Sequence, residues 1–170
     1  MKTLLLLRHA KSAWPDGVED HDRPLAERGR RDAPRMGAYM AGVGLEPDVA
    51  LVSSARRTHE TWALVTPAFG RACPSQTVAS IYEAEPAAIL AAIHAAPQGS
   101  GTLLVIGHNP GLEDLAMLLA PEGDADTVVR LRSKYPTAGL AVIRFDSERW
   151  ADVAPGAGWL TAFMTPKTLP

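Results

Sequence analysis

Two histidines each follow an apolar run that predicts a strand. His9 comes after Leu4–Leu7 and Arg8, in the tetrapeptide Arg-His-Ala-Lys. His108 follows the run that ends at Ile106, in the pentapeptide Gly-His-Asn-Pro-Gly. A neutral imidazole can act as a nucleophile, and an imidazole can also carry a proton near neutral pH. The residue types and their positions after strands therefore indicate covalent or acid–base chemistry at these two histidines.

Arginines accompany the histidines and indicate an anionic substrate. Arg8 precedes His9, and Arg56 and Arg57 stand at the start of a helical pattern that follows the strand ending at Val52. Guanidinium groups match phosphate oxygens in bidentate geometry, and helix N-termini add backbone donors. Positive neighbours also disfavour imidazolium, which keeps His9 neutral. We expect His9 to attack phosphorus and form a phosphohistidine that water hydrolyses, while the second histidine donates to the phosphoryl oxygens.

Short apolar runs alternate with helical patterns along most of the chain, so the expected fold is α/β. The pattern predicts a three-layer α/β/α sandwich whose central sheet is mostly parallel, with an antiparallel edge strand. Ligands of such sheets bind beyond the carboxyl ends of the strands, where the histidines and arginines would meet. The expected strands cover residues 3–7, 48–52, 102–107 and 139–145, with candidates at 76–79 and 159–165; the expected helices cover 26–43, 56–69, 85–95 and 111–119; and 121–137 and 146–158 are expected to be loops.

Length and composition place the chain among ordinary globular enzymes. Its 170 residues suit a single domain, residues 1–170, and 46% hydrophobic residues exclude a disordered chain. A net charge of −2 gives no indication of a nucleic-acid or membrane partner. The only cysteine, Cys73, excludes an internal disulfide. The apolar run Leu4–Leu7 is too short for a signal peptide, so a cytoplasmic location is expected.

Four motifs together resemble the histidine phosphatase superfamily, which is phosphoglycerate mutase-like, and in particular its SixA-type phosphohistidine phosphatase branch. The motifs are Leu-Leu-Arg-His-Ala-Lys-Ser (6–12), Arg-Pro-Leu-Ala-Glu-Arg-Gly (23–29), Ser-Ser-Ala-Arg-Arg-Thr-His-Glu-Thr (53–61) and Gly-His-Asn-Pro-Gly (107–111). The resemblance implies that His9 is the phosphorylated nucleophile and that Arg8, Arg57 and His108 form the phosphate pocket. Arg57 matches the family arginine because it lies four residues before Thr61. The resemblance implies no metal and no organic cofactor.

The sequence departs from the larger members of the family at the proton donor. Those members carry an acidic donor in an inserted segment, which this chain lacks, and the nearby candidates are Glu83, Glu85 and the loop Asp20-His21-Asp22. A phosphomonoester needs a positioned acid, whereas the labile P–N bond of phosphohistidine has a leaving group that solvent can protonate. The expected substrate is therefore phosphohistidine on a protein, such as a phosphotransfer domain or a phosphocarrier protein.

Two other functions remain open on the sequence alone. The chain could hydrolyse a small phosphorylated metabolite, which would be favoured if Glu83 or Asp22 reached the pocket. It could also be a phosphoprotein-binding module without activity, although an intact His9 argues against that. A phosphoglycerate mutase role is the least favoured, because the chain lacks the insertions that would hold a bisphosphate. The oligomeric state is not indicated.

Several residues near the motifs have weaker signals. Ser12 is expected to bind phosphate, whereas Lys11 is as consistent with a solvated loop as with a phosphate contact. Trp14 could touch substrate, and His21 could line the mouth of the pocket. The run Arg28-Gly29-Arg30-Arg31 most simply forms a solvated helix face, with docking of an acidic phosphoprotein as the minority interpretation.

Overall fold

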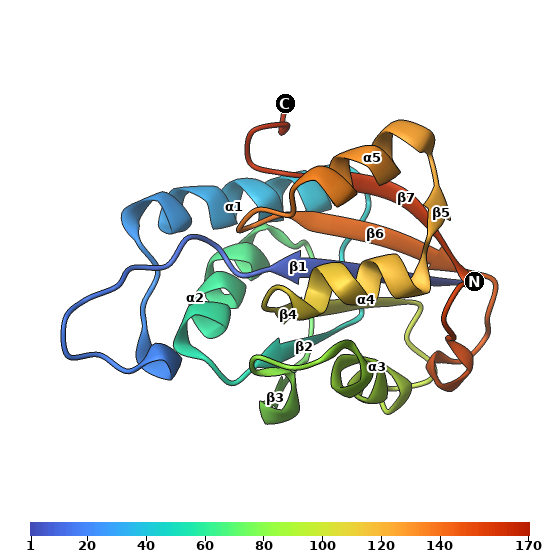
Figure 1. Cartoon of the computed structure of the whole chain (residues 1–170), viewed down its shortest axis with the longest axis horizontal. Coiled ribbons are helices and arrows are strands. Elements are labelled where there is room, and N and C mark those ends of the chain that lie inside the picture. The colour runs from blue at the N-terminus through green and yellow to red at the C-terminus, as the bar shows by residue number, and fades with distance from the viewer.

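A seven-stranded mixed sheet forms the centre of the molecule (Figure 1). The computed structural model describes all 170 residues. The strands lie in the order β3-β2-β4-β1-β6-β7-β5. They are β1 (Lys2–Arg8), β2 (Val49–Ser53), β3 (Ser75–Val78), β4 (Thr102–Gly107), β5 (Glu122–Gly123), β6 (Leu140–Phe145) and β7 (Gly158–Met164).

The first four strands in this order, β3, β2, β4 and β1, are all parallel. β6 pairs antiparallel with both β1 and β7, so the antiparallel strand lies inside the sheet and not at its edge as expected. The two edge strands are β3, which is parallel to β2, and the two-residue β5, which is parallel to β7. Because β2, β4 and β1 are parallel neighbours, the segments that follow them all emerge at the same end of the sheet, beyond the carboxyl ends of these strands.

Helices cover both faces of the sheet. They are α1 (Glu27–Gly42), α2 (Arg56–Val65), α3 (Pro86–His94), α4 (Gly111–Leu119) and α5 (Ala125–Ser133), with 3-10 turns at Asp20–Asp22, Thr66–Ala68, Ala79–Ile81 and Trp150–Asp152. Leu4 and Leu6 belong to the core beneath α3–α5, whereas Leu5 and Leu7 belong to the core beneath α1 and α2. A strand buried on both faces needs apolar residues at every position, which explains the continuous leucine run of β1.

Two expected boundaries are wrong for identifiable reasons. Residues 121–137 are not a loop, since they contain β5 and α5. Only Thr127 and Leu131 of α5 are buried, so its sequence has too weak an apolar stripe to indicate a helix. The helix expected over 56–69 ends at Val65 and continues as a 3-10 turn that contains Pro67, a residue that cannot donate to the helical hydrogen-bond ladder.

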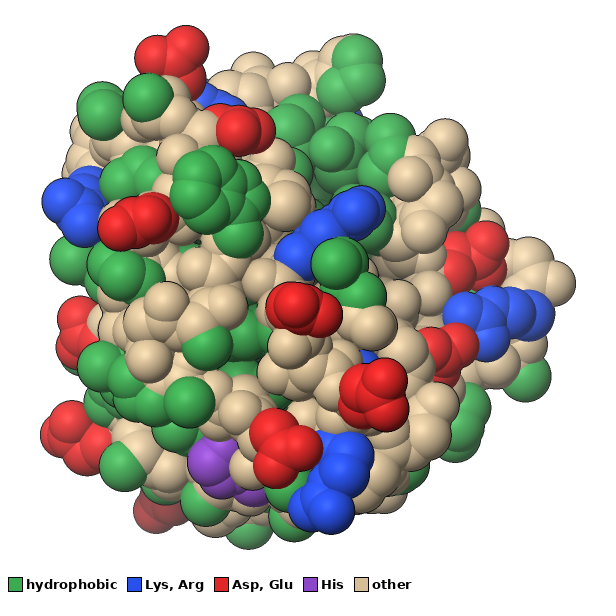
Figure 2. All heavy atoms as spheres, turned by 90° about the vertical axis from the view of Figure 1, so that its right-hand side faces the viewer, with side chains coloured by type: hydrophobic (Ala, Val, Ile, Leu, Met, Phe, Trp, Pro, Cys, Tyr) green, Lys and Arg blue, Asp and Glu red, His purple; other side chains and the backbone are tan.

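The face at the opposite end of the sheet, where the parallel strands begin, has no dominant charge. Figure 2 shows acidic, basic and hydrophobic side chains intermixed over this face. No helix of the structure has the length and apolar character that crossing a bilayer would require.

Candidate active site

The predicted histidines and arginines meet at the carboxyl ends of β1, β2 and β4. The ring centroids of His9 and His108 are 5.3 Å apart. Nη2 of Arg57, from the first turn of α2, lies 3.3 Å from Nδ1 of His108. The parallel pairing of the three strands brings these side chains together, although His9, Arg57 and His108 are far apart in the sequence.

His9 is held in a single tautomer. Its Nδ1 lies 2.8 Å from the carbonyl oxygen of Ala10, so Nδ1 carries the proton and donates it. The lone pair of Nε2 is then free for attack. The pKa of His9 is lowered to about 3, chiefly by burial and also by the neighbouring His108, Arg57 and Arg8, against the raising effect of the hydrogen bond to the Ala10 carbonyl oxygen. The imidazole is therefore neutral over the whole physiological range.

Thr61 connects the nucleophile to the helix that carries Arg57. Its Oγ1 accepts a hydrogen bond from the backbone N–H of Ala10 at 3.0 Å and donates to the carbonyl oxygen of Arg57 at 2.7 Å. All three groups are buried, so neither bond competes with water. In the sequence, Thr61 served only to assign Arg57 by its spacing. A polar side chain on the buried side of a helix is the signal that could have indicated its role in holding the loop after His9.

His108 is also neutral, with the opposite tautomer. Arg57 can only donate, so Nδ1 of His108 accepts from it, and Nε2–H donates to Oγ of Ser53 at 2.7 Å. Burial and, after it, the adjacent Arg57 lower the pKa of His108 to about 4, although the Asp20 carboxylate acts in the opposite direction. Ser53, the last residue of β2, thus fixes the orientation of the second histidine.

Arg57 is held by Asp20, which the sequence suggested as a candidate proton donor and not as a partner of this arginine. Its Nη1 donates to the carbonyl oxygen of Asp20 at 2.8 Å, and its Nη2 donates to Oδ2 of the same residue at 3.1 Å. Tyr82 and Arg23 also donate to this carboxylate. Burial alone would raise the pKa of Asp20, but the hydrogen bonds from Tyr82, Arg23 and Arg57 hold it well below its usual range. Asp20 is therefore ionised and cannot serve as a proton donor.

Arg8 projects from the end of β1 and keeps much of its hydrogen-bonding capacity. Its only side-chain hydrogen bond runs from Nη1 to the carbonyl oxygen of Tyr135, at 2.9 Å. The Nε atoms of Arg8 and Arg57 are both buried without a partner. An unpaired buried donor costs roughly 1–3 kcal/mol, so these guanidinium groups favour an anionic acceptor nearby. The arrangement fits a phosphoryl group in charge and in donor type.

The loop after the nucleophile supports the site from one side. Ser12 uses its hydroxyl to accept a hydrogen bond from Arg23, whose guanidinium also stacks 3.2 Å from the ring of Trp14. The phosphate-binding role of Ser12 stays a prediction. Lys11 is exposed, and Gly29 of α1 lies so close to it that an added Cβ would be 2.2 Å from the Lys11 carbonyl oxygen. Only glycine permits this approach of α1 to the nucleophile loop.

The remaining candidate proton donors lie either in a cavity beside His108 or on the loop 20–22. Glu83 and Glu85 line a cavity of about 240 Å³ that also includes His108. Glu83 has a φ of 48°, a backbone conformation that non-glycine residues rarely adopt. His21 donates to or accepts from Ser54 Oγ at 2.9 Å beside the site, whereas Asp22 has a side chain that is 72% exposed and pairs with His21.

Three other side chains of the types found in the site, Arg56, His59 and His94, lie outside this arrangement. Arg56 is exposed and forms an ion pair with Glu60, in agreement with the assignment of Arg57 as the site arginine. His59 is exposed, and His94 forms a hydrogen bond with the carbonyl oxygen of Val153. The structure has no group of three or more His, Cys, Asp or Glu side chains placed to hold a metal ion.

Comparison with known proteins agrees with the geometry. Residues 4–86 match the family model of the histidine phosphatase superfamily (branch 1). An uncharacterised protein of Mycobacterium tuberculosis is 39% identical over 163 residues, which cover 95% of this chain and 100% of that protein. An uncharacterised chloroplastic protein of Arabidopsis thaliana is 34% identical over 173 residues, which cover 93% of this chain and 74% of that protein.

Solved structures match over nearly the whole chain. One from Nakamurella multipartitia, assigned provisionally as the phosphohistidine phosphatase SixA, has 29% identity and a TM-score of 0.86, covering 97% of this chain and 96% of its own. The protein histidine phosphatase SixA complexed with tungstate has 22% identity and a TM-score of 0.79, covering 99% of both chains, and shares the fold. The sequence motifs, the sheet and these matches lead to one conclusion: the chain belongs to the histidine phosphatase superfamily and has the phosphoglycerate mutase-like fold.

Proposed function

We propose that this protein hydrolyses phosphohistidine on another protein through a covalent phosphohistidine at Nε2 of His9. The observation that carries the proposal is the hydrogen bond from Nδ1 of His9 to the Ala10 carbonyl oxygen, 2.8 Å long, in a neutral imidazole beside Arg8 and Arg57. This arrangement presents an unprotonated nitrogen to a group that two guanidinium ions attract. A histidine with a merely structural role would not need a free Nε2 in a cationic pocket.

In the first step, the Nε2 lone pair of His9 attacks phosphorus and forms a P–N bond. The P–N bond to the substrate imidazole breaks, and the leaving nitrogen takes up a proton from solvent. Arg8 and Arg57 stabilise the charge on the equatorial phosphoryl oxygens during the transfer. In the second step, water attacks the same phosphorus, the bond to Nε2 breaks, and inorganic phosphate leaves with His9 restored to its neutral form.

His108 has a role in both steps. In the free site, burial and Arg57 keep it neutral. A bound dianionic phosphoryl group opposes both effects, since a nearby negative charge raises the pKa of an imidazole. His108 then takes up a proton from solvent at Nδ1, the hydrogen bond from Arg57 Nη2 to this atom breaks, and Nδ1–H donates to a phosphoryl oxygen. Ser53 Oγ continues to accept from Nε2–H.

Phosphohistidine is the favoured substrate class because Asp20 and Tyr82, the two acids that lie beside Arg57, are unsuited to protonating an alkoxide. Asp20 is ionised, and burial together with the Asp20 carboxylate raises the pKa of Tyr82 to about 12. A phosphoramidate has no comparable need for an acid. We further propose that the reaction requires no metal ion, so activity should survive dialysis against EDTA.

A second candidate function is hydrolysis of a small phosphomonoester. Glu83 favours it, because this carboxyl group and His108 line the same cavity. If Glu83 is a general acid, the Glu83→Gln variant should lose about 10²-fold or more in turnover of a monoester and far less with phosphohistidine.

The test compares the wild type, His9→Ala, Glu83→Gln and His59→Ala, an exposed histidine of α2 that serves as the matched control. Substrates are a phosphohistidine protein, a phosphohistidine peptide and p-nitrophenyl phosphate. We expect the turnover of His9→Ala to be at least ~10³-fold lower than that of the wild type, and we expect this variant to trap no acid-labile phosphate. The control variant His59→Ala should keep the wild-type turnover and should still trap acid-labile phosphate. Unchanged activity in His9→Ala would overturn the mechanism. Preference for the monoester would overturn the substrate class, and tight binding without turnover would identify a binding module.

A further inference from the structure

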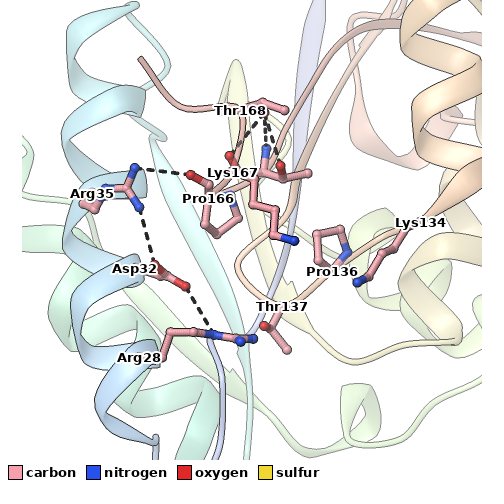
Figure 3. Close-up of a pocket in the computed structure, with 10 residues that line it drawn as sticks. Arg28, Asp32, Arg35, Lys134, Pro136, Thr137, Pro166, Lys167 and Thr168 are labelled. Atoms are coloured by element: carbon pink, nitrogen blue, oxygen red, sulfur yellow. Dashed lines mark hydrogen bonds and ion pairs between the residues drawn. The ribbon is translucent and has the colours of Figure 1, made fainter.

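A strongly basic cavity lies beside the active site and takes no part in the proposed reaction. It has a volume of about 440 Å³ and is lined by four cations, Arg28, Arg35, Lys134 and Lys167, with Asp32 as the single acid. The remaining lining residues are threonines and prolines of the segments 136–137 and 165–168 (Figure 3). The chain as a whole has a net charge of −2, so this positive site is a local feature.

Asp32 arranges the two arginines from within α1. Its carboxylate lies 4.0 Å from Nε of Arg28 and 3.5 Å from Nη1 of Arg35, and its side chain is only 12% exposed. Arg35 also donates from Nη2 to the carbonyl oxygen of Pro166, at 3.2 Å. One carboxylate thus holds two guanidinium groups at the wall of the cavity and neutralises only one of their two charges.

The two lysines are unpaired. Neither Lys134 nor Lys167 forms an ion pair with any acidic side chain, and the only carboxylate that lines the cavity is the one between the arginines. Figure 3 shows the two lysine side chains extending toward Pro136 from opposite sides. Both ammonium groups line one cavity, so both would attract an anion bound there.

The cavity and the catalytic site share a wall, the segment 134–138. On one side, Tyr135 accepts a hydrogen bond from Arg8, and the N–H of Ala138 donates to the carbonyl oxygens of Arg8 and His9, at 3.0 Å each. On the other side, residues 134, 136 and 137 line the cavity. A ligand whose phosphoryl group lies at His9 must therefore cross this segment to reach the cations.

We propose that this cavity binds carboxylate side chains of the protein substrate, next to the phosphohistidine that the enzyme cleaves. The inference rests on the proposed function. A polypeptide is long enough to lie over the segment 134–138, and its Asp and Glu side chains complement the cations. Apart from Pro136 and Pro166, every side chain that lines the cavity is charged or carries a hydroxyl group, and four of the five charged ones are cations, which favours an anionic ligand. The arginine side chains are 60% and 50% exposed, so each ion pair is weak and the site acts through several of them together.

The test uses the double variant Lys134→Gln/Lys167→Gln, which removes the two unpaired charges and keeps most of each side chain. The control is Arg144→Gln/Arg149→Gln, which removes the same number of positive charges. Arg144 lies at the other end of the sheet, where it is opposite Thr3 in the register of β6 and β1. The substrates are a phosphohistidine peptide with flanking Asp and Glu, the same peptide with Asn and Gln, and phosphoramidate. We expect about a tenfold higher KM for the acidic peptide with the lysine variant, with kcat unchanged, and no effect on the other two substrates or in the control.

Equal effects on the acidic and the neutral peptide, or no effect on either, would overturn the cavity assignment while leaving the proposed function in place. If no phosphohistidine substrate is hydrolysed, the proposed function fails, and binding of the unphosphorylated peptides decides the cavity separately. The backbone N–H signals of Thr137 and Thr168 in NMR spectra should then shift with the acidic peptide, and not with the neutral one or in the lysine variant. Unmoved signals would refute the site.

Discussion

Lowering the pH from 8 to 5 should cost this protein about 4 kcal/mol of its free energy of unfolding through His9 and His108 alone. In the folded state, burial lowers their pKa values to about 3 and about 4, from the ordinary value of 6.5. In the unfolded chain, both would titrate near 6.5. Between that value and the folded pKa values, the unfolded chain binds more protons than the folded one, so stability falls as the pH falls.

The magnitude follows from the width of this window. Each pH unit below 6.5 costs roughly 1.36 kcal/mol per histidine, and pH 5 lies 1.5 units below it, which gives about 2 kcal/mol for each. Stabilities of domains are typically ~5–15 kcal/mol, so the loss from His9 and His108 is a substantial share. The stabilisation is fully present above about pH 7 and is lost progressively toward pH 4.

The assay is urea denaturation of the wild type, His9→Asn, His108→Asn and the double variant at pH 8 and pH 5. Other groups, such as the ionised Asp20, titrate alike in all four proteins and cancel from the difference. Each single variant should reduce the pH-dependent loss by about 2 kcal/mol, and the double variant by about 4. The same loss in the wild type and the double variant would refute the burial of two neutral imidazoles.

Three further outcomes are expected from single substitutions. Arg57→Ala should lower kcat/KM by about 10²–10³-fold, whereas the exposed Arg56→Ala should stay within about twofold; equal losses would contradict the assignment. Thr61→Val should leave the buried N–H after the nucleophile unpaired, lowering both turnover and, by ~1–3 kcal/mol, the free energy of unfolding measured in urea. Gly29→Ala should lower the free energy of unfolding by ~1–3 kcal/mol and lower Tm, because the added Cβ would lie 2.2 Å from the backbone carbonyl oxygen of Lys11. The control Gly42→Ala should raise Tm slightly, because nothing lies within 4 Å of a Cβ added there.

The parts of the site that follow buried strands could be predicted from the sequence. β1 and β4 are buried on both faces, so each reads as a continuous apolar run, and the residues after them had to lie at the sheet edge. The family resemblance separated Arg57 from Arg56, because the family arginine lies four residues before the position of Thr61. The structure buries Arg57 and exposes Arg56.

The long-range polar partners could not be predicted. Asp20 reaches Arg57 and Tyr82 across 37 and 62 positions of the sequence, and no local pattern marks such pairs. Strand order has the same limitation, since the apolar run of β6 contains nothing that places it between β1 and β7. The cavity beside the site was equally hidden, because its cations come from α1, the segment after α5 and the segment after β7.

The central position of β1 has a consequence for synthesis of the chain. Leu4 pairs with Leu103 on one side and with Ile143 on the other, so this strand is synthesised well before either of the strands that pair with it. Pairings this distant in sequence make folding slow, and an unpaired apolar strand is prone to aggregate while the ribosome is still translating. The Leu4–Leu7 run should therefore be the segment that chaperones shield on the nascent chain. During refolding, the return of phosphatase activity, which depends on His9, would then report that the sheet is complete.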